Sequence, residues 1–222
     1  MLTVLTVPTM LTIARSRMSR ASRAAERGMT IIELMIGLAI VAIVLFVAVP
    51  AFTIFLQNQQ IKNAAQTVMT GLSSARAEAI RRNQAVRFQF VSNLTAGCVL
   101  SANSLAWAVS LADPTGNCEA TPGDMGAAAQ IVEKRSATEG TRNVVVATTG
   151  GTTATFTGLG RLSGGGITQI DFSNATGICE HIDAVNGTMR CLRVLVSPGG
   201  EARMCDPKVA APVPPAIDPR AC

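Results

Sequence analysis

The sequence predicts an α+β protein in which one long N-terminal helix, membrane-spanning in its first part, packs on an antiparallel β-rich head. An uncharged apolar run extends from Leu34 to Leu56, and apolar positions then continue with helical spacing to Asn83. Beyond Asn83, short β-type segments alternate with clusters of Gly, Asn, Ser and Pro. These observations together predict one helix followed by antiparallel sheets.

The apolar run is long enough to cross a membrane, because about 23 residues extend roughly 35 Å as a helix. Five arginines precede the run, and the first cation after it is Lys62. The positive-inside rule therefore predicts a cytoplasmic N-terminus and an exported remainder. We expect Pro50, inside the run, to remove one backbone hydrogen bond and bend the helix.

Glu33 stands directly before the apolar run. An acid at the edge of a membrane helix is costly unless it stays at the interface or finds a partner. Cleavage after Gly28 would place a new α-amino group on Met29, and this amine, on the same chain or on a neighbour, is a natural counter-ion. One alternative is a plain signal anchor with an incidental acid. The other is a secretory signal peptide cleaved near Val49-Pro50-Ala51, for which the apolar core is too long.

The segment from Gln57 to Asn83 predicts an amphipathic helix with one apolar stripe. We expect the stripe to lie against a sheet because its alanines allow close approach; a coiled-coil seam is the alternative. The stripe consists of Ile61, Ala65, Val68, Leu72, Ala75 and Ala79, and outside it lie Lys62, Arg76, Glu78, Arg81 and Arg82.

Eight strands are expected after this helix, separated by turn-forming clusters. Their expected ranges are 85–90, 105–111, 130–134, 143–147, 153–156, 169–172, 189–196 and 202–204.

The net charge of +5 is concentrated before the apolar run, since residues 1–28 hold five Arg and one Glu. The remainder carries 14 cations and 13 acids, so bulk charge does not indicate nucleic-acid binding. In an oxidising compartment the even cysteine count predicts disulfides. Of 15 possible pairings we expect neighbours to pair, and the last pair would tether a Pro-rich tail at 207–222. These pairs are Cys98 with Cys118, Cys179 with Cys191, and Cys205 with Cys222.

The chain shows no catalytic or metal-binding constellation. His181 is the only histidine, and no C-x-x-C motif is present. A Ser-His-Asp site needs an oriented histidine, and a zinc site needs close ligand pairs. The sequence therefore predicts no enzyme, no metal and no cofactor, and a membrane-anchored enzyme is only a rival hypothesis.

Residues 28–34 and the helix after them resemble the class III leader of type IV pilins and type II secretion pseudopilins. The resemblance implies that prepilin peptidase cleaves between Gly28 and Met29 and methylates Met29, which stands where Phe is commoner. It also implies that Glu33 sets the assembly register against a neighbour's amine, with other pilins or pseudopilins as partners of the helix. The expected leader is long for the class, and Met10 and Met18 are alternative starts.

Three further stretches resemble the GspH/FimT branch of this family: Leu72–Asn83, Phe156–Arg161 and Leu192–Gly200. The resemblance implies a type IV pilin-like fold, with a leader at 1–28, a filament-core helix at 29–56, a head at 57–206 and a tail at 207–222. It implies an inner-membrane protein with a periplasmic head that later joins a pilus or pseudopilus. The cysteine-rich head and tethered tail favour the pilus over the secretion machine.

Some FimT members act as DNA receptors through a Gly-Arg-any-Arg stretch near the C-terminal cysteines. In the matching segment here, Arg203 is kept but Glu201 replaces the first arginine, and an acid repels phosphate. DNA binding is therefore not favoured. Its candidate contacts are Arg190, Arg193, Arg203 and Lys208.

Overall fold

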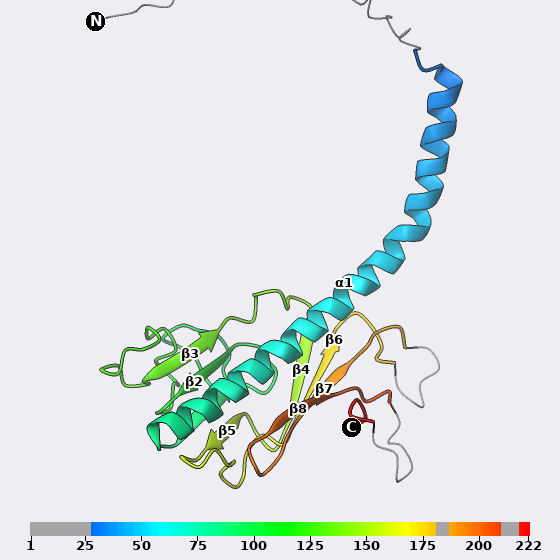
Figure 1. The fold of residues 1–222 in the computed structure, drawn as a ribbon. Helices are drawn as coiled ribbons and strands as arrows, with labels where there is room; N and C mark the ends of the chain where they lie inside the picture. Colours follow the sequence, from blue (N-terminus) through cyan, green and yellow to red (C-terminus); the bar gives the residue numbers. More distant parts are fainter. Residues whose placement is uncertain (1–27, 181–186, 210–217) are drawn as a thin grey trace, which may run out of the picture. The chain divides into compact units, whose positions relative to one another are not determined.

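The computed structural model of the chain describes residues 28–180, 187–209 and 218–222. The expected leader, apart from Gly28, and His181 lie outside these ranges. The described residues divide into two compact units, one that ends at Val44 and one that begins at Leu45. The described part forms one helix followed by eight strands (Figure 1): α1 (Ile31–Arg82), β1 (Val86–Phe90), β2 (Trp107–Ser110), β3 (Ile131–Arg135), β4 (Val144–Thr149), β5 (Thr153–Phe156), β6 (Gln169–Asn174), β7 (Leu192–Val196) and β8 (Ala202–Cys205).

Each expected strand is present; the bounds of β5 are those expected, and the bounds of the others differ by one to three residues. The largest shift is at β7, which begins at Leu192 because Met189 instead forms an isolated bridge with Cys179. Strand β2 is shorter than expected, and its pairing with β3 changes register between Val109 and Ser110. The predicted strand positions are thus confirmed, while tertiary pairing decides their ends.

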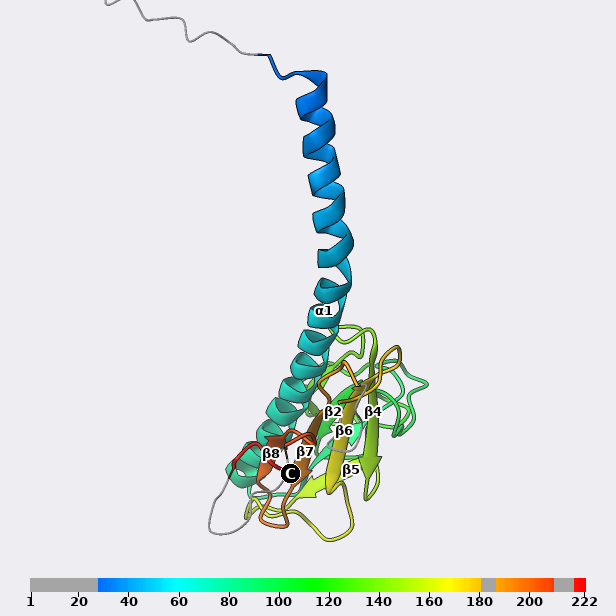
Figure 2. The ribbon, with the colours of Figure 1, turned by 90° about the vertical axis from the view of Figure 1, so that its right-hand side faces the viewer.

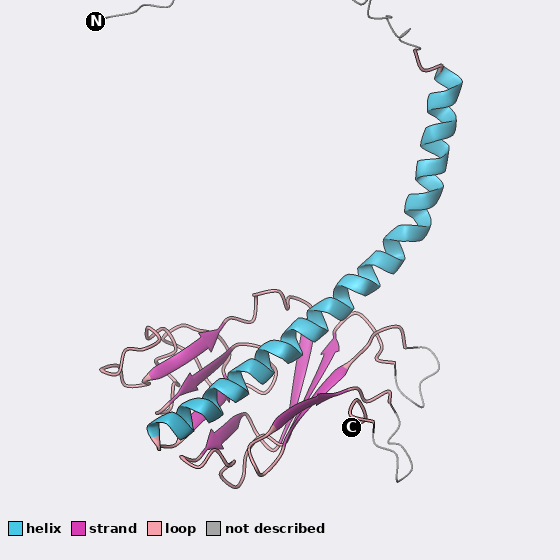
Figure 3. Cartoon of the chain, viewed as in Figure 1, coloured by secondary structure: helices cyan, strands magenta, loops and turns pink. Residues whose placement is uncertain are grey.

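The strands form two antiparallel four-stranded sheets, in the orders β3-β2-β1-β5 and β4-β6-β7-β8. Within the unit at 45–222, both sheets lie on one side of the second half of α1 (Figures 2 and 3). The prediction of an α+β fold with an antiparallel head is confirmed.

The stripe on the second half of α1 forms the centre of the hydrophobic core. All six predicted stripe residues are buried, and Ala64 joins them. They share one cluster with Phe88 and Phe156 of the first sheet and with Phe172 and Val194 of the second. Gly71 lets the helix approach closely, since an added Cβ would lie 2.8 Å from the Phe88 ring and 2.9 Å from the Trp107 ring. The stripe is therefore a helix-on-sheet surface and not a coiled-coil seam.

Helix α1 ends in a Schellman motif. Asn83 has a positive φ of 51°, and its N–H donates to Ile80 O at 3.2 Å. The N–H of Gln84 donates to Ala79 O at 3.2 Å, which satisfies another carbonyl of the last turn. Gly158 packs on this cap, because a Cβ there would lie 2.6 Å from Asn83 Oδ1. Position 158 therefore requires a residue without a Cβ, because the Asn83 cap occupies the space.

The three GspH/FimT-like stretches meet next to this cap. Arg76 Nε donates to Gly160 O at 3.1 Å, and Leu162 N donates to Pro198 O at 3.1 Å. Gly160 and Gly200 both have positive φ, 72° and 80°, and a Cβ at Gly200 would collide with Gly160 O. The shared residues therefore join the helix end to both sheets, which is a structural role.

Glu78 is held between two arginines on the last turns of α1. Its carboxylate accepts from Arg81 Nε at 2.8 Å and from Arg81 Nη2 at 2.6 Å, and Arg82 Nε also donates to it. The hydrogen bond from Arg81 is the main cause that lowers the pKa of Glu78 to about 2, with Arg82 adding to the effect. Glu78 is therefore an anion above that pH.

The three disulfides join neighbours in sequence: Cys98 to Cys118, Cys179 to Cys191, and Cys205 to Cys222. These are the pairs that we expected. The last one holds the C-terminal residues beside β8, where Asp206 N donates to Arg220 O at 2.7 Å and Asp206 bridges Ala221.

Candidate functional site

Gly28, Met29 and Thr30 precede the first turn of α1 and lie exposed. Thr30 is the N-cap, because its Oγ1 accepts from Glu33 N at 3.3 Å and its carbonyl accepts from Leu34 N at 3.1 Å. The Thr30-x-x-Glu33 spacing is that of a capping box. Our sequence analysis missed this cap, although the spacing alone could have revealed it.

Gly28 is not required by the fold. A Cβ added to it would meet no atom within 4 Å, and it is not among the residues with positive φ. Met29, directly after it, is 70 % exposed. Both sides of the expected cleavage point are thus unobstructed by the rest of the described chain.

Glu33 is exposed in the first turn of α1. None of the ion pairs among the described residues includes it. A carboxylate at this position interacts favourably with the helix dipole. It stays open to a further cation.

The apolar run exposes an unusual amount of hydrophobic surface. By length and composition α1 can cross a membrane, and its most apolar 18-residue window has no buried residue. Most of the described large side chains along it are about half exposed or more, with Phe46 at 86 %. Such a surface needs lipid or other apolar helices as its surroundings. The helix continues through Pro50, and the bend expected there stays a prediction.

The four candidate DNA contacts all have partners on the protein. Arg190 Nε lies 2.9 Å from Asp206 Oδ2, and Arg193 Nε lies 2.6 Å from Asp171 Oδ1. Lys208 Nζ forms an ion pair with Glu180 Oε1, and Arg203 Nη1 donates to Ala221 O at 3.2 Å. The cations are therefore offset by acids or used for the tail, and they form no uncompensated basic patch.

Within the ranges that the structure describes, no group of three or more His, Cys, Asp or Glu side chains could hold a metal ion. His181 lies outside those ranges. The geometry on which a function can rest is therefore the capped, exposed helix start and the apolar surface after it.

Two family models match these regions. One describes a prokaryotic N-terminal methylation motif and matches residues 23–49, and the other describes the type II transport protein GspH and matches residues 64–200. The chain belongs to the GspH family. It is a minor pilin or pseudopilin with a prepilin peptidase processing motif, a structural subunit and not an enzyme. The GspH/FimT resemblance is thereby confirmed, and family membership implies membrane anchoring and assembly with other pilins.

Two crystal structures of the type IV minor pilin FimU from Pseudomonas aeruginosa, in space groups P65 and P21, are similar to this chain. Each is 15 % identical, with TM-scores of 0.40 and 0.43. The matches cover 64 % and 68 % of this chain, and 90 % and 91 % of the FimU chains. No curated protein matches the chain.

Proposed function

We propose that the chain is a minor pilin of a type IV pilus, anchored in the bacterial inner membrane with a periplasmic head. Prepilin peptidase cleaves it after Gly28 and methylates Met29, and the mature subunit is then extracted into the filament. The observation that carries this proposal is the long exposed apolar helix, which begins with a capped turn bearing Glu33.

The apolar helix has two successive environments in this proposal. Before assembly, lipid covers its exposed side chains; after assembly, the helices of neighbouring subunits cover them. The head keeps its own core, so the exchange does not require the head to unfold.

Glu33 supplies the register of assembly. Transfer from the interface to a bundle of apolar helices is costly for a carboxylate without a counter-ion. Cleavage creates one such counter-ion on each subunit, the amine of Met29. A neighbour is therefore accepted in the position that pairs its amine with this carboxylate.

The test is the variant Glu33→Ala in a strain that lacks the native gene. We expect normal membrane insertion but severalfold less subunit in sheared filaments, measured by immunoblot of membrane and filament fractions. Glu119→Ala removes an exposed head carboxylate and serves as the matched control. Normal incorporation of the Glu33→Ala variant would refute the register role.

Intact-mass and N-terminal analysis of protein from membranes tests the processing step. We expect a chain that begins with methylated Met29 and carries three disulfides. A chain that still includes Gly28, or that begins after Leu56, would contradict the filament-subunit proposal.

The three disulfides of the head and its tethered tail support the pilus machine over the secretion machine. Deletion of the gene should therefore reduce surface pili and leave type II export of folded proteins unchanged. The opposite pattern would assign the chain to the secretion pseudopilus. We do not propose a DNA receptor, because the candidate cations are already engaged.

A further inference from the structure

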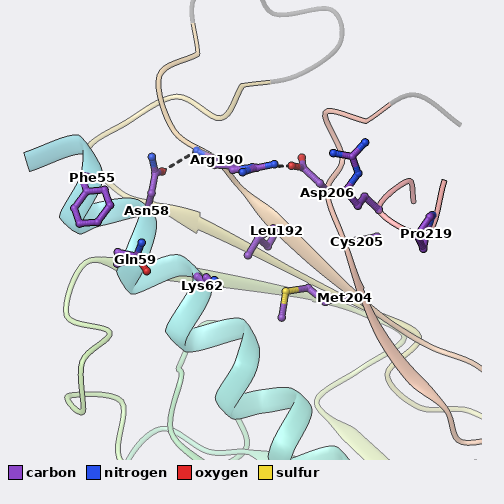
Figure 4. Close-up of a pocket in the computed structure, with 11 residues that line it drawn as sticks. Phe55, Asn58, Gln59, Lys62, Arg190, Leu192, Met204, Cys205, Asp206 and Pro219 are labelled. Carbon is purple, nitrogen blue, oxygen red and sulfur yellow. Dashed lines mark hydrogen bonds and ion pairs between the residues drawn. The ribbon is translucent and has the colours of Figure 1, made fainter. Parts of the chain in front are cut away.

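A groove of about 510 Å³ lies within the unit at 45–222, between α1 and the ends of β7 and β8. Figure 4 shows Phe55 and Lys62 on the helix, with Leu192 and Met204 on the facing strands. Arg220, from the C-terminal segment, also lines the groove. The wall on that side depends on the Cys205–Cys222 disulfide, which holds the segment beside β8.

The groove combines an apolar floor with an unpaired cation. Arg190 and Arg220 are paired with Asp206 and Asp218. Lys62 is exposed and takes part in none of the ion pairs among the described residues. Its ammonium is therefore available to an anion.

The position of the groove along α1 indicates where that anion comes from. Phe55 belongs to the apolar run that ends at Leu56, and Lys62 follows Leu56 by about 9 Å of helix. The polar headgroup layer of a bilayer is about 5–8 Å thick on each side. A lysine side chain at this height reaches back to that layer while its stem lies on apolar surface.

We propose that this groove binds the headgroup of an anionic phospholipid of the membrane in which α1 is anchored. Lys62 contacts the phosphate, and Leu192, Met204 and Phe55 contact the glycerol backbone and the first acyl carbons. This contact holds the membrane-anchored subunit by its head, and it is broken on extraction into a filament. The inference goes beyond the filament role and rests only on the membrane anchoring of α1.

The experiment uses the mature full-length chain in micelles of an uncharged detergent, titrated with dihexanoyl-phosphatidylglycerol and followed by calorimetry. We expect saturable binding, and about fivefold weaker binding by Lys62→Gln, which corresponds to the about 1 kcal/mol typical of one cation near an anionic membrane surface. Arg161→Gln is the matched control. Arg161 is exposed and adjoins Gly160, which contacts Arg76, about 21 Å further along α1 than Lys62.

Equal weakening by Lys62→Gln and Arg161→Gln would overturn the proposal, because the effect would then be general charge. Inorganic phosphate that displaces the lipid at equal concentration would overturn it as well, since the site would then be an anion site only. The native chain should bind dihexanoyl-phosphatidylcholine at least fivefold more weakly than dihexanoyl-phosphatidylglycerol, and equal binding would overturn the choice of an anionic lipid. Met204→Ser, checked for folding by denaturant unfolding, should bind dihexanoyl-phosphatidylglycerol more weakly than the native chain, because the variant loses apolar surface in the groove. The assay requires no filament, so its failure would leave the filament proposal untouched.

Discussion

The two halves of α1 share one backbone conformation but differ in how their apolar side chains are distributed and buried. From Leu34 to Leu56 the helix carries no charge, and most of its described large side chains are exposed. From Gln57 to Arg82 most of its large apolar residues lie in one stripe, which is buried against two sheets, and Ile80 is an exposed exception. Helix formation is thus common to both halves, and the distribution of apolar residues around the axis decides what each half contacts.

The comparison shows that packing inside the head restricts the size of particular residues, whereas a surface that is covered only by lipid or by other chains does not carry this restriction within the chain itself. The second half needs small residues at defined places, such as Gly71 under the Phe88 and Trp107 rings. The first half has no such requirement within the described chain, since a Cβ at Gly37 would meet no atom within 4 Å. Its constraints come from surroundings that lie outside the chain.

Phenylalanine truncation is expected to separate the two halves most strongly. Phe88 is fully buried in the core beneath α1, whereas Phe46 is 86 % exposed. Phe88→Ala should lower the free energy of unfolding of the head by about 3–5 kcal/mol, because it removes a buried ring and leaves a cavity. Phe46→Ala should change it by less than about 0.5 kcal/mol. Trp107, the only tryptophan, reports the unfolding in denaturant.

Glycine substitution gives the next largest contrast. Gly71→Ala should destabilise the head by about 1–3 kcal/mol, because its methyl group overlaps two buried rings. Gly37→Ala has open space and should leave the head unchanged. Thermal or denaturant unfolding of the two purified variants checks this. Equal stability of both would mean that the helix can move away from the sheet without cost.

The smallest expected effect is the loss of stability of the head on acidification, through Glu78. The pKa of Glu78 is lowered to about 2, so the charged form is favoured in the folded head. Its stabilisation is complete above about pH 4.5 and is lost as the pH falls toward 2. Unfolding measured across this window should show a weaker pH dependence in Glu78→Gln than in the native chain. An unchanged slope would mean that the Arg81 and Arg82 contacts add nothing to stability.

Several features of the fold and of the candidate site could be predicted because they depend on near neighbours in the chain. Helical spacing placed Ile61, Val68 and Leu72 in the core, and alternation with turn residues located the strands. Thr30 was missed although its spacing from Glu33 signals a cap. The roles of Arg76, Gly160 and Gly200 were beyond prediction, since they arise where three distant stretches meet.

The sequence by itself determined the membrane-length helix, the processing motif and the buried stripe. These follow from composition and periodicity, which act along the chain. Only the tertiary structure decided that the cations near the C-terminus have partners on the protein and that two glycine loops join the sheets. It also decided that Lys62, beside an apolar groove, forms no ion pair with another described residue. Those properties depend on distances between residues far apart in sequence, which folding sets.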